Sequence, residues 1–188
     1  MTPTFTLPRF AAVLAALALF CASGQALAQK VRLATTLGDI VVELDAEKAP
    51  KTVDNFLRYV KAGHYSGVIF HRVINGFMVQ TGGYTADLKE KSTRPPIPLE
   101  ARNGLSNLRG SIAMARTSDP NSATAQFFIN VVDNPRLDDM GGGYAVFGKV
   151  VEGMDVVDQI RAVPTRANGV HGNLPETPIS IKKATLEN

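Results

Sequence analysis

The residues whose types could do chemistry gather in one short stretch of the chain, from position 70 to position 82. Arg72 and Gln80 are the polar side chains that stand out, and the large apolar residues Phe77 and Met78 lie between them. A guanidinium is always charged and planar, and it can hold a carbonyl oxygen while pointing a hydrogen elsewhere. These groups suit a ligand that is apolar on one side and rich in carbonyls on the other. A proline-containing peptide is such a ligand.

The elements that must position these side chains are predicted by the surrounding pattern. Apolar runs at 68–70 and 77–79 flank a turn that carries Asn75 and Gly76. Asn-Gly between two such runs is a strong hairpin signal, because both residue types tolerate positive φ. The pattern therefore predicts two paired strands, with the polar residues on defined sides of the pleat.

The same stretch carries a family resemblance. The segment FHRVINGFMVQTG, at 70–82, resembles the signature of the cyclophilins, the cyclosporin-binding class of peptidyl-prolyl cis-trans isomerases. Blocks at 112–116, 125–130 and 144–150 are similar to that family's other blocks, in the same order, and the exported bacterial members are the most similar variants. The resemblance runs from about Lys30 to the C-terminus. It implies an enzyme that accelerates rotation about Xaa-Pro bonds and uses no metal or organic cofactor.

The resemblance also implies roles for particular residues. Arg72 corresponds to the family's catalytic arginine. The residues that match the family's proline pocket are Phe77, Met78, Phe128 and Leu137. Phe127 and Phe128 are neighbours, so on a strand they face opposite ways. We expect one of them in the core, and the resemblance assigns Phe128 to the pocket.

Four further positions match residues that contact the peptide. Gln80 and Gln126 match side chains that orient the arginine and the substrate backbone. Ala115 and Arg116 match a segment that pairs with the peptide through main-chain hydrogen bonds, so we expect Arg116 to act through its backbone.

Two positions depart from the better-known eukaryotic pattern. This chain has Arg136 where those members carry a tryptophan before Leu137, and Tyr144 where they carry a histidine. The tryptophan helps to hold cyclosporin, so we expect weak cyclosporin binding. Tyr144 can still close the pocket with its ring and offer a hydroxyl.

Many short strands and two helices are predicted along the rest of the chain. Helical spacing of apolar residues occurs at 49–63 and 153–163. The predicted strands lie at 31–35, 40–44, 68–70, 77–79, 110–115, 127–131, 144–150 and 178–184. Evenly spaced short strands are typical of a closed barrel or a sandwich. The resemblance implies the barrel: a mainly β fold, with an eight-stranded antiparallel closed β-barrel capped by two α-helices.

Residues 1–28 are predicted to be a signal peptide rather than part of the fold. Arg9 is followed by an apolar run at 10–21, and Ala26-Leu27-Ala28 matches a cleavage site, so we place the cut after Ala28. The alternative is an uncleaved anchor. A cleaved chain would leave by the general secretory route and act in the periplasm. The domain at 29–188 would then contain no cysteine, because Cys21 leaves with the signal, and its stability would come from the core alone.

Other function classes fit the sequence poorly. The chain has 20 Lys and Arg against 17 Asp and Glu, with no basic block, so we expect no nucleic-acid partner. The three histidines, at 64, 71 and 171, do not have a metal-ligand spacing. We expect a monomer.

Two alternatives to an enzyme stay open at this stage. The groove could dock proline-bearing segments without turnover, or the domain could have only a structural role. The combination of Arg72 and Gln80 favours catalysis, since docking alone requires neither group to point at the prolyl nitrogen.

Overall fold

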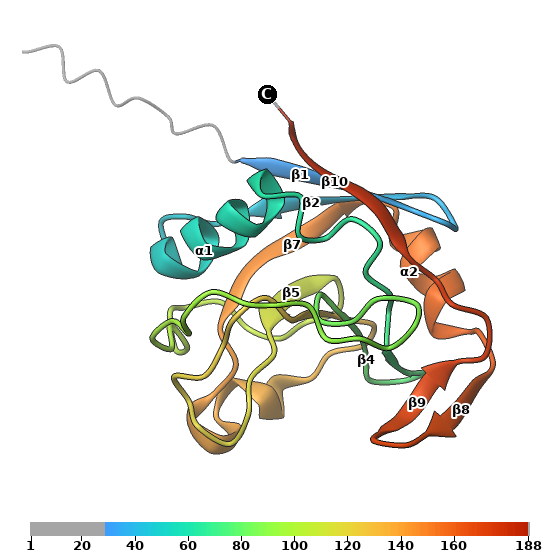
Figure 1. Cartoon of the computed structure of the whole chain (residues 1–188). Helices are drawn as coiled ribbons and strands as arrows, with labels where there is room; N and C mark the ends of the chain where they lie inside the picture. The colour runs from blue at the N-terminus through green and yellow to red at the C-terminus, as the bar shows by residue number, and fades with distance from the viewer. Residues whose placement is uncertain (1–28, 188) are drawn as a thin grey trace, which may run out of the picture.

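A computed structural model describes residues 29–187 of the chain. The predicted signal peptide and its cut after Ala28 lie outside the described residues. Eight strands form one antiparallel sheet in the order β10-β1-β2-β7-β5-β6-β4-β3, which curls around an apolar core (Figure 1). Their bounds are β1 Lys30–Thr35, β2 Asp39–Leu44, β3 Arg72–Ile74, β4 Met78–Thr81, β5 Ser111–Met114, β6 Phe127–Asn130, β7 Val146–Glu152 and β10 Ile181–Glu187.

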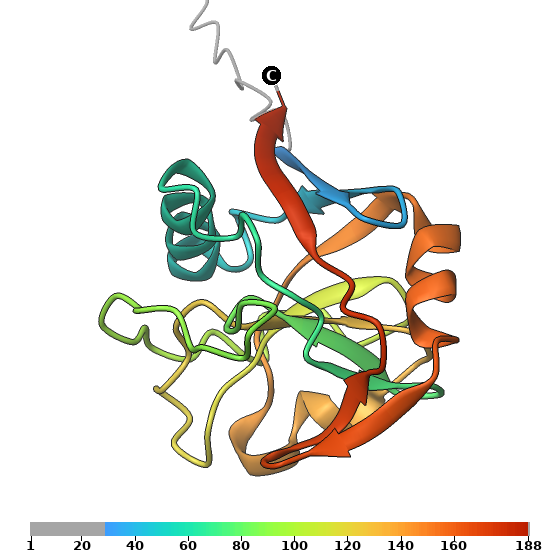
Figure 2. The same ribbon diagram turned by 45° about the vertical axis from the view of Figure 1, so that its right-hand side comes forward.

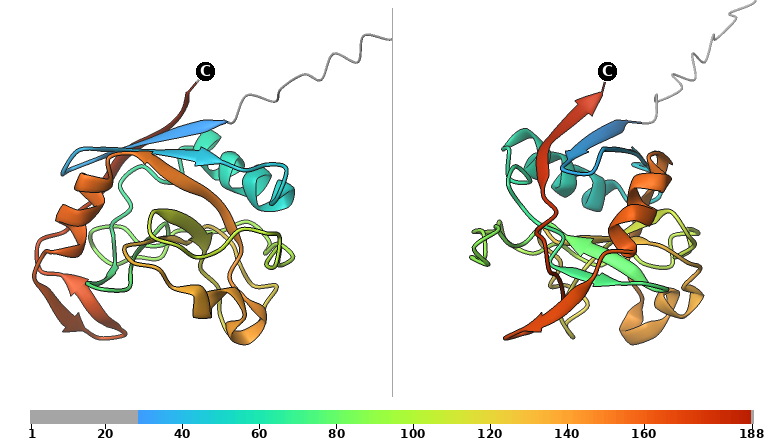
Figure 3. Two further views of the ribbon diagram at one scale, coloured as in Figure 1. Left: turned by 180° about the vertical axis from the view of Figure 1, so that it is seen from behind. Right: turned by 90° about the vertical axis from the view of Figure 1, so that its right-hand side faces the viewer.

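The two predicted helices are present, and they lie at opposite sides of the curled sheet (Figure 3). They are α1 (Pro50–Lys61) and α2 (Met154–Arg161). The prediction of an eight-stranded antiparallel sheet with two helices is therefore confirmed. Neither helix within 29–187 is long and apolar enough to cross a membrane.

The closed barrel is corrected to an open half-barrel. Regular strand pairing ends at β10 on one edge and at β3 on the other. Between them, Ile69 forms an isolated bridge with Ser180, and the amide of Phe70 donates to the carbonyl of Ile179 at 2.9 Å. The predicted pairing of 68–70 with 77–79 is thus wrong. This buried run pairs on one side with 84–85, where Val68 bridges Thr85. On its other side it crosses the seam of the barrel to the segment at 179–181.

The core is built around Phe56 of α1. Its ring lies 5.3 Å, centroid to centroid, from each of Tyr65, Phe127 and Phe147. Aromatic contacts at this distance are favourable beyond the area that they bury. The helix is thereby held against the inner face of β6 and β7. Truncation of such a residue to alanine typically destabilises a protein by roughly 3–5 kcal/mol.

The start of α1 is completed by a residue far away in sequence. Ala49 at the N-cap provides no side-chain acceptor. The Glu100 carboxylate accepts hydrogen bonds from the amides of Lys51 (3.1 Å) and Thr52 (2.8 Å) and from the Thr52 hydroxyl (2.8 Å). A negative charge at a helix N-terminus satisfies free amides and complements the helix dipole. Glu100 therefore ties the loop before β5 to the helix.

A second, two-stranded sheet follows α2. It consists of β8 (Thr165–Asn168) and β9 (His171–Pro175), and β9 lies beside β3 (Figure 2). All four residues of β8 are exposed. The hairpin extends the molecule on the side where the sheet edge carries Arg72.

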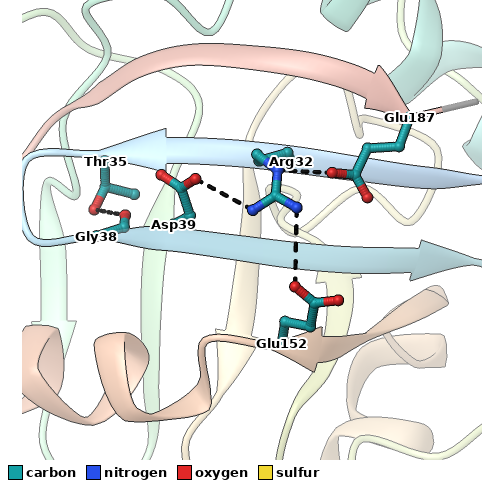
Figure 4. Close-up of polar contacts among 6 residues, drawn as sticks. All are labelled: Arg32, Thr35, Gly38, Asp39, Glu152 and Glu187. Carbon is teal, nitrogen blue, oxygen red and sulfur yellow. Dashed lines mark hydrogen bonds and ion pairs between the residues drawn. The ribbon is translucent and has the colours of Figure 1, made fainter.

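Charged groups cross the outer face of the sheet at its other edge. Arg32 of β1 donates from Nε to Glu187 of β10 at 2.6 Å and from Nη1 to Asp39 of β2 at 3.2 Å. Its Nη2 lies 3.8 Å from Glu152 of β7 (Figure 4). These hydrogen bonds, to Glu187 first and then to Asp39, raise the pKa of Arg32. The group links four neighbouring strands, but its exposure to water keeps its contribution to stability small.

The adjoining β1–β2 turn is fixed by a short contact. The Thr35 hydroxyl donates to the carbonyl of Gly38 at 2.6 Å (Figure 4). Gly38 has φ of +138°, a conformation that side-chain-bearing residues rarely adopt. The turn thereby returns the chain into β2 next to β1.

Candidate active site

The hairpin at the β3 edge places the polar residues opposite each other. In the β3–β4 register Arg72 faces Gln80. The turn between the strands has three residues: the amide of Phe77 donates to the carbonyl of Ile74 at 3.0 Å, and Gly76 has φ of +81°. The Asn-Gly hairpin is therefore confirmed, with its first strand at 72–74.

A row of side-chain amides runs from Arg72 of β3 through Gln80 of β4 to Gln126, which lies directly before β6. Nη1 of Arg72 donates to Oε1 of Gln80 at 3.3 Å, and Nε2 of Gln80 donates to Oε1 of Gln126 at 2.9 Å. No ion pair within residues 29–187 includes Arg72, and the residue is exposed. Its charge is oriented by a neutral amide, so most of its five donors are available to a ligand.

An apolar cluster lies beside this row, on the outer side of the sheet and separate from the core. Its buried members are Met78, Ala113, Phe128, Leu137 and Val146, and the partly buried residues around them are Ile74, Phe77, Leu105, Ala115 and Tyr144. The rings of Phe128 and Tyr144 meet nearly edge to face at 5.8 Å. The five apolar and aromatic residues singled out from the sequence are thus brought together.

The two neighbouring phenylalanines of β6 divide as predicted. Phe127 belongs to the core and Phe128 to the outer cluster. Gln80 pairs with Phe128 across β4 and β6, so the amide row and the apolar cluster share the same strands. The guanidinium carbon of Arg72 lies 6.0 Å from the Phe77 ring centroid, so the cation borders the apolar cluster directly.

The loop that carries Leu137 is held by a carboxylate. The chain turns as a 3₁₀ helix, η1 (Pro135–Asp138). Asp138 accepts hydrogen bonds from the hydroxyl of Ser106 and from the amide and side chain of Asn107, the last two at 2.8 and 2.7 Å. Burial raises the pKa of Asp138, but these hydrogen bonds outweigh that effect and leave the pKa below its usual value. Sequence reasoning missed this anchor, because its partners lie about 30 positions away.

The amide of Ala115 is already used within the protein. It donates to the carbonyl of Gln126 at 2.9 Å, which holds the end of β5 against the start of β6. The main-chain pairing predicted for Ala115 and Arg116 therefore has to use their other backbone groups.

Comparison with known proteins identifies the family. Residues 30–186 match the model described as cyclophilin type peptidyl-prolyl cis-trans isomerase/CLD. The chain belongs to the cyclophilin-type peptidyl-prolyl cis-trans isomerases. It is 56% identical over 158 residues to the peptidyl-prolyl cis-trans isomerase A of Dickeya dadantii (strain 3937), covering 83% of each chain. It is 53% identical over 157 residues to the peptidyl-prolyl cis-trans isomerase B of Escherichia coli (strain K12), covering 81% of this chain and 96% of that one.

Solved structures agree with this assignment. A cyclophilin type peptidyl-prolyl cis-trans isomerase of Cryptosporidium parvum superposes with a TM-score of 0.72 at 29% identity, covering 86% of this chain and 98% of the other. The same protein in the presence of the dipeptide Ala-Pro gives a TM-score of 0.71. The resemblance drawn from the sequence is confirmed, and this cyclophilin is an isomerase of Xaa-Pro peptide bonds by family.

In this cyclophilin the side chain of Arg116 is engaged, contrary to the expectation that only its backbone matters. Its guanidinium carbon lies 4.4 Å from the centroid of the Tyr144 ring, and its nitrogens donate to carbonyls of the loop at 140–143. Arg136, for which the resemblance implies a departure from the eukaryotic pattern, is exposed on η1 directly before Leu137.

A buried histidine lies directly before Arg72. The His71 ring is 4.8 Å from the Tyr84 ring and 5.9 Å from the His171 ring of β9, and its Nδ1 has no hydrogen-bond partner among the residues that the structure describes. Burial, and then the nearby His171, lower the pKa of His71 to about 4. The ring is neutral at pH 7, so it adds no second cation beside the guanidinium.

Proposed function

We propose that this chain isomerises Xaa-Pro bonds of exported polypeptides, with Arg72 as its catalytic residue, and that it thereby assists their folding. The observation that carries the proposal is the placement of Arg72 directly beside a separate apolar cluster. This cation is oriented by one amide and has no carboxylate partner within residues 29–187. An arginine held in an ion pair would have its donors occupied before any substrate arrived.

The chemistry requires no covalent step. An Xaa-Pro bond rotates over a barrier of roughly 18–20 kcal/mol, because the planar amide is stabilised by resonance. At the top of the barrier the prolyl nitrogen has lost that resonance and becomes a hydrogen-bond acceptor. A guanidinium hydrogen directed at this nitrogen stabilises the twisted amide more than the planar one, which is how differential binding accelerates a reaction.

The remaining residues have supporting roles in this proposal. The proline ring would lie against Phe77, Met78, Phe128 and Leu137, with Tyr144 closing one side. Gln80 and Gln126 would fix the direction of Arg72 and receive the peptide backbone. Backbone groups of Ala115 and Arg116 would pair with the peptide. The Cryptosporidium cyclophilin studied with Ala-Pro supports a ligand of this class.

The proposal includes a place and a set of partners. Residues 1–28 would direct the chain through the general secretory route and be removed after Ala28, leaving a monomer in the periplasm. Bound partners would be proline-containing polypeptides and no nucleic acid. Cyclosporin would bind weakly because Arg136 replaces the tryptophan. No cofactor is needed, since no bond is made or broken.

The test uses residues 29–188 and a short Ala-Pro peptide. Exchange NMR measures the rate at which the cis and trans forms interconvert with and without protein. We expect acceleration by orders of magnitude over the uncatalysed reaction, in which one interconversion takes tens to hundreds of seconds. If the folded protein binds the peptide without accelerating its isomerisation, the domain is a docking module. If the folded protein neither binds the peptide nor accelerates its isomerisation, the domain has a structural role.

Export is tested separately with the full chain. Expression in a Gram-negative bacterium, followed by fractionation and N-terminal sequencing, should recover a periplasmic protein that begins at Gln29. Recovery of a membrane-bound protein that begins at Met1 would favour the uncleaved anchor.

A further inference from the structure

Arg116 lies one residue beyond Ala115 at the end of β5, and its side chain reaches a loop more than twenty positions later in the chain. Nε and Nη2 both donate to the carbonyl of Gly143, at 3.0 and 2.9 Å. Nη2 also donates to the carbonyls of Met140 (3.1 Å) and Gly141 (2.8 Å), and Nη1 to that of Thr117 (2.9 Å). Each of the three guanidinium nitrogens is therefore engaged with main-chain carbonyls.

The loop that receives these hydrogen bonds contains a short 3₁₀ turn, η2 (Met140–Gly142), in which the amides of Gly142 and Gly143 donate to the carbonyls of Asp139 and Met140 at 3.1 and 3.0 Å. Gly141, Gly142 and Gly143 follow one another with φ of +60°, +95° and +97°. Consecutive glycines in left-handed conformations have the largest backbone freedom to lose on ordering. A planar fork of fixed geometry that contacts several carbonyls at once restricts the loop in a way that a single donor could not.

The same guanidinium also holds a ring of the apolar cluster. Its central carbon lies 4.4 Å from the centroid of Tyr144, the residue that follows the glycines. Tyr144 in turn meets Phe128 edge to face at 5.8 Å. A chain of contacts thus leads from the Arg116 cation through Tyr144 to Phe128 at the buried centre of the cluster.

The charge of Arg116 is not committed to an ion pair. None of the ion pairs within 29–187 involves it, so its interactions there are with carbonyl dipoles and an aromatic face. Both kinds of contact depend on the planar shape of the guanidinium as well as on its charge. A lysine would preserve the charge and lose the fork.

We propose that Arg116 is a positioning residue for isomerisation, which acts through its side chain by fixing the loop at 139–143 and holding Tyr144 as one wall of the proline pocket. The proposal rests on the proposed function of this site. Because Arg116 holds a pocket wall and does not contact the reacting bond, its removal should weaken the binding of proline peptides far more than it slows rotation of the bound peptide.

The test compares Arg116→Lys and Arg116→Ala with the wild-type protein, residues 29–188. Arg58→Ala is the matched control, since it removes the same charge from the exposed face of α1, where Arg58 forms an ion pair with Asp54. Exchange NMR gives the dissociation constant of an Ala-Pro peptide and the interconversion rate of the bound peptide. We expect both Arg116 variants to weaken binding roughly tenfold with the bound rate within about twofold of wild type, and Arg58→Ala to change neither.

A second readout follows the ring itself. The chain has four tyrosines, so fluorotyrosine labelling gives four resonances, and Tyr144→Phe identifies the one from Tyr144. In both Arg116 variants we expect that resonance to shift and the other three to stay in place. If Arg116→Ala does not fold, the same measurements are made on Arg116→Lys, which keeps the positive charge and removes the planar guanidinium.

Two results would overturn the proposal: unchanged peptide affinity with an unmoved Tyr144 resonance, or full rescue by lysine, which would reduce the role to charge. A loss confined to the bound rate would also contradict it, because Arg116 would then act on the reaction itself. Failure of the proposed function looks different, since wild type and Arg58→Ala would then both leave the peptide unaccelerated.

Discussion

Two arginines near opposite edges of the same sheet have opposite surroundings. Arg32 of β1 contacts three carboxylates, those of Asp39, Glu152 and Glu187 (Figure 4). Within the described part of the chain, the side chain of Arg72 of β3 makes one hydrogen bond, at 3.3 Å, to the neutral amide of Gln80. Both lie on short antiparallel strands, with Arg32 half-buried and Arg72 exposed, so secondary structure does not distinguish them.

The difference lies in whether the charge is already matched. The donors of Arg32 are directed at carboxylates of neighbouring strands, so its role is to link the strands of the sheet. The donors of Arg72 are held in direction by Gln80 and Gln126 but are not neutralised. The comparison indicates two features that distinguish a ligand-binding arginine from a structural one: it has no neighbouring carboxylate, and it borders an apolar surface.

The largest expected effect comes from removing the unmatched charge. Arg72→Ala should lower kcat/KM by roughly 10²–10³-fold, as is typical for the loss of one preorganised donor to a transition state. Thermal stability should stay close to wild type, because the residue is exposed and forms no ion pair within residues 29–187. The peptide-exchange assay and a melting curve measure the two quantities.

Arg32→Ala is the matched control for this substitution. It removes an equal charge from the other edge of the sheet and should leave kcat/KM unchanged. A comparable loss of activity in both variants would mean that the net charge of the molecule, and not the placement of Arg72, controls the reaction.

Acid should protonate His71, which is neutral at pH 7, and so place a second cation beside Arg72. The pKa of His71 is lowered to about 4, against 6.5 in an unfolded chain, so the unfolded chain binds this proton more readily. His71 therefore has no destabilising effect above pH 6.5, and stability falls as the pH drops from 6.5 to 4. The loss that this residue contributes is about 3 kcal/mol.

The contribution is isolated by comparison with His71→Gln, whose side chain does not titrate. Free energies of unfolding are measured by denaturant titration at several pH values from 7 to 4. The wild-type curve should fall more steeply than that of the variant. Parallel curves would show that His71 protonates as easily in the folded protein as in the unfolded chain.

Arg72 can also be made to resemble Arg32. In Gln80→Glu a carboxylate replaces the amide oxygen 3.3 Å from Nη1. The new ion pair should divert the guanidinium from the substrate and lower kcat/KM roughly tenfold, equivalent to about 1.4 kcal/mol of transition-state stabilisation. Activity equal to wild type in the exchange assay would mean that a matched arginine serves as well as an unmatched one.

The smallest effect is expected from the far end of the amide row. A Cβ at Gly83 would lie 2.7 Å from Cδ and Nε2 of Gln126. That flexible end can move aside, so Gly83→Ala should fold normally but displace the group that orients Gln80. We expect a loss of activity of a few fold with unchanged melting. An unaltered kcat/KM would show that Gln126 is not needed to direct Arg72.

Much of the fold could be predicted because its signals are local. The helices at 49–63 and 153–163 appear as α1 and α2 because apolar spacing and the flanking Pro50 and glycines act over neighbouring residues. The opposite faces of Phe127 and Phe128 follow from strand geometry alone. Local patterns of this kind need no knowledge of tertiary contacts.

What the sequence did not predict depends on distant partners. The run at 68–70 is predicted to pair with 77–79, but it pairs with 84–85 and, across the seam, with 179–181. The β8–β9 hairpin was not predicted, because the exposed residues of β8 show no apolar alternation. Glu100, which completes α1, lies 48 positions from Thr52.

The site divides in the same way. The spacing of Arg72, Gln80 and the apolar pair was visible in one stretch of sequence, and the resemblance supplied the residues on other strands. The side-chain role of Arg116 could not be foreseen, because it requires a glycine loop 24 to 27 positions later to fold back against the end of β5.

The central claim is that the unmatched charge of Arg72 acts on the twisted amide and not on ground-state binding. The most direct test is exchange NMR of an Ala-Pro peptide with wild type and Arg72→Ala, which yields the interconversion rate of the bound peptide and its dissociation constant separately. The account predicts that the bound rate falls by roughly 10²–10³-fold while affinity changes only a few fold. An unchanged bound rate, with the whole loss in affinity, would contradict it and leave Arg72 as a binding residue.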